Sequence, residues 1–346
     1  MSKKKLGILG GGQLGMFMCQ AAKRNNIHTI VFSNTKNFSA KSFCDSYFVA
    51  GFDNKKILKE FIESSDFITI ETENIPKHIL KEIESKKKLF PSSFIIEISQ
   101  NRLKEKKFLN SIDCVSTVKY KTIVNFNDLK ESLKSFNNKA ILKSCEMGYD
   151  GKGQFLICNK NIDQFREMSF KDFILEEKIN FEKEISVIVC RTKKKIITYP
   201  PVENLHKESI LRETTYPAAI NKSLEEMAIF IAKKISIELE LEGILAIEMF
   251  VMKDNSILVN EIAPRPHNSG HWTLDYCKFS QFDNLLMAIF NSSVESPMPI
   301  MNCKMVNVIG KEYKKKNDFI KNYKFYDYYK DEIKELRKMG HYTFKC

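Results

Sequence analysis

Hydrophobic and polar positions alternate in two different ways along the chain, and the change falls near residue 99. Before it, short apolar runs such as 6–9 and 67–70 are followed by segments with apolar residues three and four apart, as in 14–21. Short apolar runs are typical of buried strands and the longer spacing is typical of helices. The pattern predicts a βαβ domain with a parallel sheet, whose ligands bind at the carboxyl ends of its strands.

After residue 99 the pattern predicts an α+β arrangement of mostly antiparallel strands. A basic helix is expected over 101–110 and a longer helix over 224–237, with strands before and after each. Short strands and aromatic residues close the chain and indicate a small terminal β subdomain. The predicted domains are 1–98, 99–295 with a lid subdomain at about 110–180, and 296–346.

Two adjacent strands in the second part predict a metal site. Residues 243–252 are apolar on both faces, and Asp254-Asn255 suits a two-residue hairpin loop. That register pairs Met252 with Ile257, Phe250 with Val259, and Glu248 with Glu261. Opposed side chains lie ~4.5–5.5 Å apart, so two buried carboxylates repel unless they share a cation. Carboxylate, phosphate and water oxygens suit Mg²⁺, with Mn²⁺ as a second candidate; an acid pair that shares one proton is the alternative.

The segment Gly10-Gly11-Gly12-Gln13-Leu14-Gly15 fits G-x-G-x-x-G between a predicted strand and a predicted helix. Backbone N–H groups at a helix N-terminus can hold an anion. A dinucleotide fold also needs an acidic residue about 20 residues later, but the second strand ends at Ser33-Asn34. The loop is therefore expected to bind a phosphate or a ribose edge without NAD.

Glu71 and Glu73 end the fourth predicted strand of the parallel sheet. Residues two apart in an extended chain share one face. These carboxylates are expected to accept hydrogen bonds from sugar hydroxyls or an amine. The alternative is a solvated loop in which Asn74 caps the next helix.

A glycine-rich loop in the middle of the chain predicts a nucleotide lid. Lys143 ends a strand, and Met147-Gly148-Tyr149-Asp150-Gly151-Lys152-Gly153 follows it. Glycines let a backbone approach phosphates, and the lysines supply charge. The strand edge Glu176-Glu177-Lys178-Ile179 could read an adenine edge and Glu184 a ribose, although alone this is only a charged strand. His206 lies in the polar cluster 204–206, and a lone histidine is more often structural than functional.

The segment 264–272 concentrates polar side chains after a buried strand. Its two prolines exclude a helix and hold the chain extended. Arg265, His267, Asn268, Ser269 and His271 project from it. Arginine offers a planar fork to phosphate oxygens, so the segment predicts a site for a phosphorylated, polar ligand; a capped strand end is the alternative.

Composition narrows the class without identifying it. The 346 residues carry a net charge of +12, nine scattered cysteines and no apolar run long enough to cross a membrane. We expect a cytoplasmic protein with reduced thiols. The lysine runs lack interleaved aromatic and arginine residues, so neither nucleic acid nor a membrane is an expected partner.

Together these motifs resemble the 5-(carboxyamino)imidazole ribonucleotide synthases, a family of purine-biosynthesis ligases in the ATP-grasp superfamily. The resemblance covers nearly the whole chain and is most specific at Pro264–Trp272; Arg337-Lys338-x-Gly340-His341 extends it to the C-terminal part. It implies an ATP-grasp fold, a homodimer, and carboxylation of aminoimidazole ribonucleotide by bicarbonate with ATP, through carboxyphosphate.

The resemblance also assigns roles to individual residues. ATP would be bound by Arg102, Lys143, Met147, Gly148, Tyr149, Asp150, Gly151, Lys152, Gly153, Glu176, Glu177, Lys178, Ile179, Glu184, His206, Asn260 and Glu261. Aminoimidazole ribonucleotide would be bound by Gln13, Leu14, Glu73, Arg265, His267, Asn268, Ser269, Arg337 and Lys338. Glu248 and Glu261 would hold the metal, and Tyr149, Lys330 and Arg265 would be catalytic.

Three departures from the family pattern and three rival functions accompany this assignment. Met147 stands where the family has glycine, Glu208-Ser209 replaces a small turn, and the motif around Lys330 is displaced by one residue, which makes Lys334 a competitor. The rivals are a formate-using ATP-grasp ligase, an NAD-dependent oxidoreductase and a basic nucleic-acid-binding protein.

Overall fold

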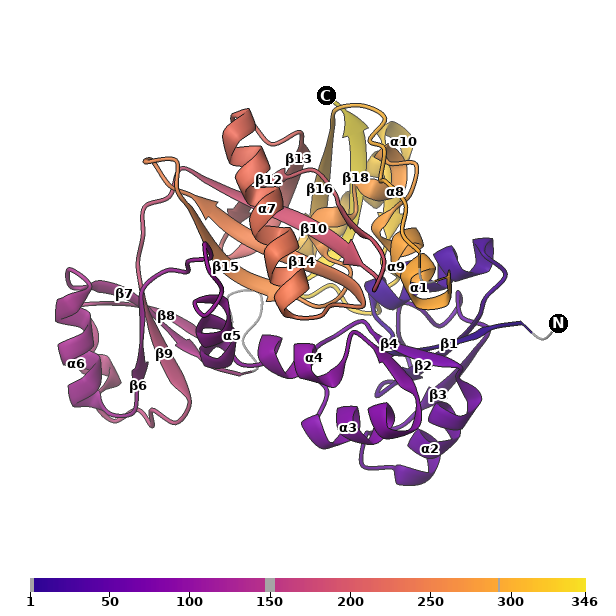
Figure 1. Ribbon diagram of the computed structural model, residues 1–346, viewed down its shortest axis with the longest axis horizontal. Coiled ribbons are helices and arrows are strands. Elements are labelled where there is room, and N and C mark those ends of the chain that lie inside the picture. The colour runs from indigo at the N-terminus through magenta and orange to yellow at the C-terminus, as the bar shows by residue number, and fades with distance from the viewer. Residues whose placement is uncertain (1–2, 147–152, 292) are drawn as a thin grey trace.

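The computed structural model describes residues 3–146, 153–291 and 293–346. Figure 1 shows three groups of strands: the parallel sheet at the N-terminus, a small sheet that stands apart at the left, and a large sheet that runs to the C-terminus. No helix among the described residues is long and apolar enough to cross a membrane.

The N-terminal part is the βαβ domain that the sequence predicts. All its strand pairs are parallel, in the order β3-β2-β1-β4-β5. From β1 the next two strands are added on one side of the sheet, and β4 and β5 are added on the other. Ligands of such folds usually bind at this change of order, between β1 and β4. The elements are β1 Lys5–Leu9, α1 Gln13–Arg24, β2 His28–Ser33, β3 Ser46–Val49, α2 Lys55–Ser64, β4 Phe67–Ile70, α3 Lys77–Lys86, β5 Lys88–Phe90, α4 Ser93–Ser99 and α5 Arg102–Leu109.

The sheet that stands apart carries the two ends of the predicted lid loop. It has four antiparallel strands in the order β6-β9-β7-β8, and α6 covers it with an apolar core of its own. The hairpin of β7 and β8 is closed by Ser144, whose N–H donates to the carbonyl of Gly153. The elements are β6 Tyr120–Ile123, α6 Phe126–Ser135, β7 Lys139–Ser144, β8 Gln154–Cys158, a 3-10 turn η1 Ile162–Phe165 and β9 Phe173–Glu177.

The large antiparallel sheet contains all the remaining strands. Its order is β15-β14-β10-β12-β13-β16-β18-β17, with β11 paired to β10. Its elements are β10 Lys183–Arg191, β11 Ile196–Thr198, β12 Val202–Lys207, β13 Ile210–Tyr216, α7 Lys222–Glu238, β14 Gly243–Val251, β15 Ile257–Ala263, η2 Asn268–Gly270, α8 Thr273–Tyr276, α9 Gln281–Asn291, β16 Cys303–Ile309, η3 Gly310–Lys315, α10 Lys316–Asn322, β17 Lys324–Asp327 and β18 Lys338–Lys345.

Helices α7 and α9 cover opposite faces of the centre of this sheet. Val187, Leu245 and Ile247 pack on α7, whereas Ile188 and Ala246 pack on the α9 side. This double burial explains why β14 is apolar at almost every position. Beyond the end of α9, polar side chains replace the apolar ones on the same face of the sheet.

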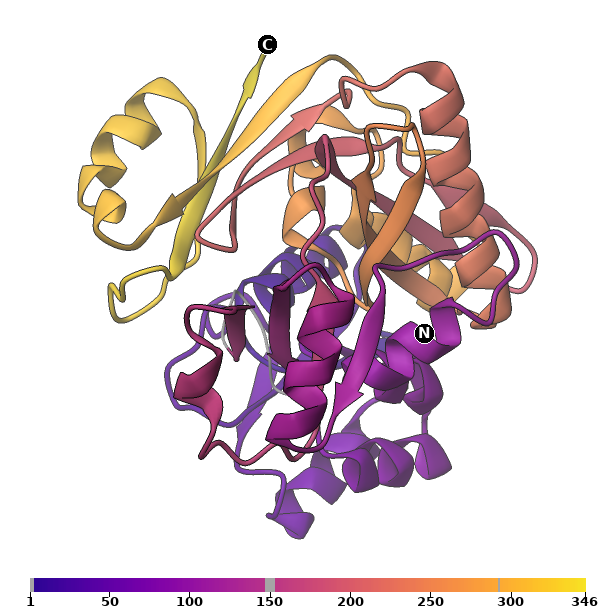
Figure 2. The same ribbon diagram turned by 90° about the vertical axis from the view of Figure 1, so that its left-hand side faces the viewer.

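The C-terminal strands continue the large sheet through the pairing of β13 with β16. Figure 2 shows this end of the sheet, in yellow, lying beside the central strands. Hydrogen bonding is therefore continuous across the predicted boundary at 295/296, and the predicted division into domains stays a prediction.

The predicted hairpin register is right at the carboxylates and wrong nearer the loop. Glu248 pairs with Glu261, but Met249 pairs with Val259 because Asn260 is an extra, bulged residue. The predicted pairs of Phe250 with Val259 and of Met252 with Ile257 do not form. The loop has three residues, because the Met252 N–H donates to the Ser256 carbonyl and Asn255 adopts a φ of 63°.

Candidate functional site

The polar end of the large sheet gathers acids from three strands. Glu184 on β10, Glu248 on β14 and Glu261 on β15 continue the rows whose apolar members pack under α9. Burial, and then the charge of Glu261, raise the pKa of Glu248 to about 7. Burial alone would also raise the pKa of Glu261, but the charges of Arg102, Lys143 and Lys106 outweigh it and hold that pKa below its ordinary value. The two opposed carboxylates therefore differ in how fully the protein neutralises them.

A buried cluster of cations lies beside Glu261. Arg102 Nη1 donates to Glu261 Oε2 at 3.1 Å. Lys143 Nζ lies 2.6 Å from Glu176 Oε2, and Lys106 Nζ lies 3.5 Å from Glu176 Oε1. Although burial opposes ionisation, these two lysines lower the pKa of Glu176 to about 2. The cluster can present fixed positive charge to an anionic ligand such as a polyphosphate.

His206 on β12 is paired rather than alone. Its Nδ1 contacts the carboxylate of Glu184. Burial disfavours the charged ring, but the hydrogen bond to Glu184 and the charge of Glu248 outweigh it and raise the pKa of His206. The pair lies next to the acids, and ribose hydroxyls suit such a donor and acceptor set.

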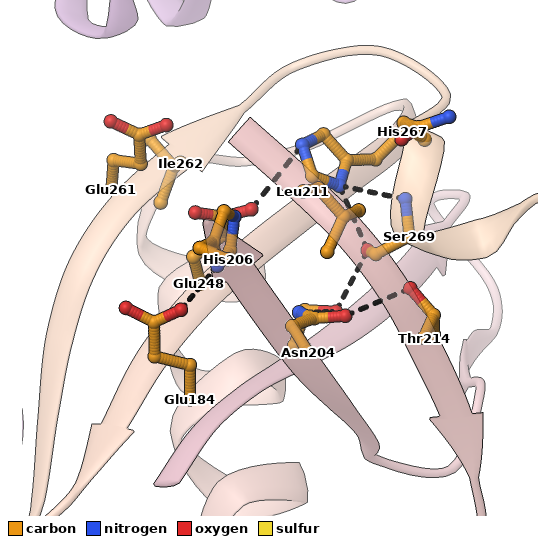
Figure 3. A network of polar contacts seen from close by, with 12 residues as sticks. Glu184, Asn204, His206, Leu211, Thr214, Glu248, Glu261, Ile262, His267 and Ser269 are labelled. Atoms are coloured by element: carbon orange, nitrogen blue, oxygen red, sulfur yellow. Dashed lines mark hydrogen bonds and ion pairs between the residues drawn. The ribbon is translucent and has the colours of Figure 1, made fainter. Parts of the chain in front are cut away.

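A chain of hydrogen bonds fixes His267 against Glu248 (Figure 3). The Thr214 hydroxyl donates to Asn204 Oδ1 at 3.0 Å, and Asn204 Nδ2 donates to Ser186 Oγ at 3.0 Å. Ser186 Oγ donates to Ser269 Oγ at 2.8 Å, and Ser269 Oγ lies 2.8 Å from His267 Nδ1. The Ser269 N–H also donates to Nδ1, at 3.3 Å.

This chain determines the tautomer of the ring. Because Nδ1 accepts, Nε2 carries the proton, and it lies 3.5 Å from Glu248 Oε1. Burial and the charge of Arg265 lower the pKa of His267 to about 3, so the ring is neutral near pH 7. A neutral, oriented donor therefore faces one of the two opposed carboxylates.

The glycine loop after β1 holds a carboxylate of the protein itself. Gly12 N and Gly15 N donate to Glu71 Oε1 and Oε2 at 2.6 and 3.0 Å. A Cβ added at Gly12 would lie 2.7 Å from Glu71 Oε1, so only glycine permits this approach. Burial raises the pKa of Glu71, and the two N–H donors partly oppose that shift. The anion position expected for a phosphate is thus filled, which also argues against a dinucleotide at this loop.

Glu73 and Arg265 form a forked ion pair between the N-terminal domain and the segment after β15. Arg265 Nε and Nη2 donate to the two carboxylate oxygens of Glu73 at 2.5 and 3.0 Å. Gln100 supports the same loop by donating to the carbonyls of Glu73 and Ile75. The fork holds both side chains in place. Burial would raise the pKa of Glu73, but the charge of Arg265 outweighs burial and lowers that pKa.

A cavity of ≈ 670 Å³ lies at the carboxyl edge of the parallel sheet, against the loop after β17. Gln13, Glu71, Lys330 and Arg337 line it. Lys338, the neighbour of Arg337, lies on another side, where its charge affects the pKa of Glu248 and His267. The structure thus brings Lys330 and Arg337 to the glycine loop and separates Lys338 from them.

Asn268 and Ser269 lie inside the protein, not along the cavity. Ser269 belongs to the chain that orients His267, and Asn268 exchanges two hydrogen bonds with Asn307. Both are buried, so direct contact with a ligand is not supported for their side chains. Leu14 is also buried, whereas Gln13 opens α1 at the cavity.

Some predicted residues lie elsewhere or outside the described part of the chain. Glu177 ends β9 opposite Ala140, and Lys178 and Ile179 begin the connection from β9 toward the large sheet, with Lys178 N donating to the Lys139 carbonyl. The predicted residues Met147, Gly148, Tyr149, Asp150, Gly151 and Lys152 lie outside the described residues.

The sequence reasoning missed Glu105, Lys106, Ser186 and Thr214. Glu105 and Lys106 share the buried face of α5 with Arg102, at spacings of three and four residues. That spacing could have identified them. Ser186 could have been found as a polar residue on the face of β10 that also carries Glu184.

Three family models match successive parts of the chain. They are the ribonucleotide synthetase preATP-grasp domain over residues 3–100, the ATP-grasp domain over 108–282, and the phosphoribosylaminoimidazole carboxylase C-terminal domain over 303–345. The first match covers the parallel sheet, the second covers the lid sheet and the centre of the large sheet, and the third covers the strands at the C-terminal end of the large sheet.

Relatives of known function are similar over almost the whole length. N5-carboxyaminoimidazole ribonucleotide synthase of Bacillus subtilis is 38% identical over 98% of this chain and 90% of its own length. The Brucella melitensis protein of the same name is 35% identical over 98% of this chain and 95% of its own.

Solved structures show the same architecture. The ADP complex of an N5-carboxyaminoimidazole ribonucleotide synthetase superposes with a TM-score of 0.95 at 36% identity, over 100% of this chain and 93% of that one. The Aspergillus clavatus N5-carboxyaminoimidazole synthase, in complex with ADP and 5-aminoimidazole ribonucleotide, has a TM-score of 0.92 at 28% identity, over 99% and 94%.

Proposed function

Because the chain belongs to the N5-carboxyaminoimidazole ribonucleotide synthase family, we propose that it joins bicarbonate to 5-aminoimidazole ribonucleotide and converts ATP to ADP and phosphate. It is an ATP-grasp ligase of purine biosynthesis. The observation that carries the proposal is that the opposed carboxylates Glu248 and Glu261 adjoin a buried cation cluster in a chain similar to these ligases from end to end.

ATP would lie between the lid sheet and the large sheet. Lys143 offers charge to the phosphates, and Arg102 fixes Glu261 beside them. Glu184 and His206, already paired, suit the ribose hydroxyls. The other proposed nucleotide contacts are Glu176, Glu177, Lys178, Ile179, Asn260 and the loop 147–153.

The donor set at Glu248 and Glu261 fits Mg²⁺, with Mn²⁺ as an alternative. Both ligands are carboxylates, and burial with mutual repulsion raises the pKa of Glu248 to about 7. A divalent cation relieves that repulsion and takes its remaining ligands from phosphate and water oxygens. When bound, it would neutralise charge that develops on the transferred phosphoryl group. Among the described residues no group of three or more histidine, cysteine and acidic side chains could hold a metal ion, so we propose that substrate phosphates and water would supply the remaining ligands.

Aminoimidazole ribonucleotide would occupy the cavity at the glycine loop. Gln13 and Arg337 line it, and Arg265, which forks to Glu73, lies close enough to Glu261 for the two charges to interact. Leu14, His267 and Lys338 complete the proposed contacts, whereas Asn268 and Ser269 would act by holding the 267–270 turn. Anchoring the substrate phosphate away from the reacting amine supplies binding energy for orientation.

The reaction proceeds in two displacements. A bicarbonate oxygen attacks the γ-phosphorus in line, and the bond to ADP breaks, which gives carboxyphosphate. The amine of the ribonucleotide then forms a bond to the carboxyl carbon, or to CO₂ released from it, while phosphate leaves and the amine loses a proton. Lys330 and Tyr149 are the proposed groups beside bicarbonate. Closure of the site excludes water from the labile intermediate.

A homodimer in the cytoplasm is part of the same proposal and comes from the resemblance. Sedimentation of the purified protein over a range of concentrations tests the dimer. A mass of one chain at micromolar concentration would contradict it.

ADP release tests the reaction itself. We expect release to require Mg²⁺, ATP and aminoimidazole ribonucleotide, and bicarbonate to raise carbamate formation. Formate in place of bicarbonate should not support product. Equal product formation with formate would favour the rival ligase and overturn the proposal.

A further inference from the structure

Strand β15 is the first strand of the large sheet, and its outer edge is covered by α5 rather than by another strand. An uncovered edge leaves backbone groups without partners. Here the Val259 N–H donates to the Ser116 carbonyl, and two side chains of α5 take the groups that follow. The two contacts from α5 fall on Asn260 and Ile262, one on each side of Glu261.

Three side chains of α5 form hydrogen bonds with Asn260, Glu261 and Ile262 of β15. Lys106 Nζ donates to the Asn260 carbonyl at 3.0 Å. The Ile262 N–H donates to Glu105 Oε1 at 2.7 Å. Arg102 Nη1 donates to the Glu261 side chain at 3.1 Å. Arg102, Glu105 and Lys106 lie on one helical face, and all are buried.

The bulge gives these contacts a consequence for the site. A bulged strand bends and re-aims its side chains. Asn260 is the extra residue, and its carbonyl bonds to Lys106 instead of to β14. Without Lys106 and Glu105, the bulge would lose the partners that hold it on both sides of Glu261. The direction of the Glu261 carboxylate toward Glu248 therefore depends on α5.

Lys106 also connects the bulge to the lid sheet. Its Nζ lies 3.5 Å from Glu176 on β9, and Glu176 binds Lys143 on β7. Lys106 is 1% exposed, so it cannot serve as a surface charge. One side chain thus fixes the bulged carbonyl and the carboxylate that orients Lys143.

We propose that Glu105 and Lys106 are positioning residues of the nucleotide and metal site, which act by holding the bulge at Asn260 and so setting the place of Glu261. The inference rests on the proposed metal site at Glu248 and Glu261. Neither residue touches the reacting atoms in this arrangement.

Paired variants at Glu105 separate the place of the accepting oxygen from the carboxyl group itself. Glu105→Gln keeps the length of the side chain and an oxygen that reaches the Ile262 N–H, whereas Glu105→Asp keeps the carboxyl group and withdraws the oxygen by one methylene. The affinity for Mn²⁺ is measured by electron paramagnetic resonance in the presence of ADP. We expect this affinity to fall about tenfold in Glu105→Asp and less than about twofold in Glu105→Gln. A tenfold loss is within the range for residues that support metal ligands. The reverse order would overturn the proposal.

Lys106→Met is compared with Lys107→Met, a change on the exposed face of the same helix. We expect Lys106→Met to weaken both ADP and Mn²⁺ binding about tenfold or more, and Lys107→Met to leave both unchanged. Thermal unfolding is measured in parallel. If Lys106→Met and Glu105→Asp lower the Tm but bind Mn²⁺ and ADP as the wild type does, the residues are merely structural and the proposal is wrong.

Failure of the metal site has its own signature. The wild type would then bind no Mn²⁺ with ADP present. In that case the affinity for ADP tests the role of α5. A lower ADP affinity in Lys106→Met and Glu105→Asp supports a positioning role, and wild-type ADP affinity in both variants overturns the proposal.

Discussion

Two pairs of glutamates, Glu71 with Glu73 and Glu248 with Glu261, lie close together at the molecule's two kinds of sheet but meet different surroundings. The first pair follows a parallel strand, and the protein supplies its partners: two backbone N–H groups for Glu71 and the fork of Arg265 for Glu73. The second pair faces across an antiparallel hairpin, and Arg102 forms an ion pair with Glu261.

The two pairs differ in how the protein shifts the pKa of their carboxylates. The pKa of Glu73 is lowered, because Arg265 outweighs burial. The pKa of Glu248 is raised to about 7, because burial and Glu261 act together against its charge. Carboxylates with cationic or N–H partners join two parts of the chain, whereas the raised pKa of Glu248 fits the metal site that we propose at Glu248 and Glu261.

The largest expected effect is on the opposed carboxylates, Glu248 and Glu261. Glu248→Gln or Glu261→Gln should lower turnover roughly 10³-fold, since a metal ion stabilises the transition state by several kcal/mol. The Tm of Glu248→Gln should not fall in the metal-free protein, because repulsion is relieved. Rates of ADP release and thermal unfolding check both statements.

Glu226→Gln, on the exposed side of α7, is the matched control. A turnover near that of the control in either active-site variant would show that the opposed carboxylates hold no metal.

Glu176 extends the comparison to a third carboxylate that the protein neutralises. Its pKa is about 2 in the fold and 4.5 ordinarily. A lowered pKa contributes stability that is present above pH 4.5 and is lost as the pH falls through 2. We expect Glu176→Gln to cost about 3 kcal/mol near pH 7. The difference in unfolding free energy between the variant and the wild type should shrink steadily below pH 4.5, and a constant difference would contradict the assignment.

Lys330 and Lys334 test which lysine serves the cavity. Both lysines line the cavity. The charge of Lys330 partly opposes the rise that burial causes in the pKa of Glu71, so Lys330 lies near the glycine loop, whereas Lys334 pairs with Glu332 and is exposed. Lys330→Met should lower carbamate formation about tenfold or more, with ADP affinity kept. Lys334→Met should change neither. A severe loss in the Lys334 variant alone would reverse the assignment.

The smallest effect is expected at Glu71, with a sign opposite to that at Glu248. Glu71→Gln replaces one acceptor oxygen with an amide, so the Gly12 or Gly15 N–H loses its partner. An unpaired buried donor costs about 1–3 kcal/mol, so the Tm should fall. If Glu71→Gln and Glu248→Gln change the Tm in the same direction, the distinction between the two pairs fails.

The sequence predicted the parts of the fold that local patterns determine. The parallel sheet follows from alternating strand and helix signals, and the pairing of Glu248 with Glu261 follows from the hairpin. The bulge at Asn260 could not be predicted, because its partners on α5 lie about 150 residues earlier in the chain. In the sequence Glu105 and Lys106 belong to a charged run that looks solvated, and only tertiary packing buries them.

The roles in the 264–272 segment could be predicted only in part. The density of polar groups predicted a site, and Arg265 and His267 contact the carboxylates of Glu73 and Glu248. The sequence could not show that Asn268 and Ser269 turn inward, because that depends on Asn307 and Ser186 from distant strands.

The continuous sheet has a consequence for anyone who designs shorter versions of this protein. The pairing of β13 with β16 means that a fragment ending before Cys303 would expose the full hydrogen-bonding edge of β13. Exposed edges of this kind recruit strands from other molecules. Such a fragment should precipitate during expression, although the family matches alone would mark the C-terminal part as a separable module.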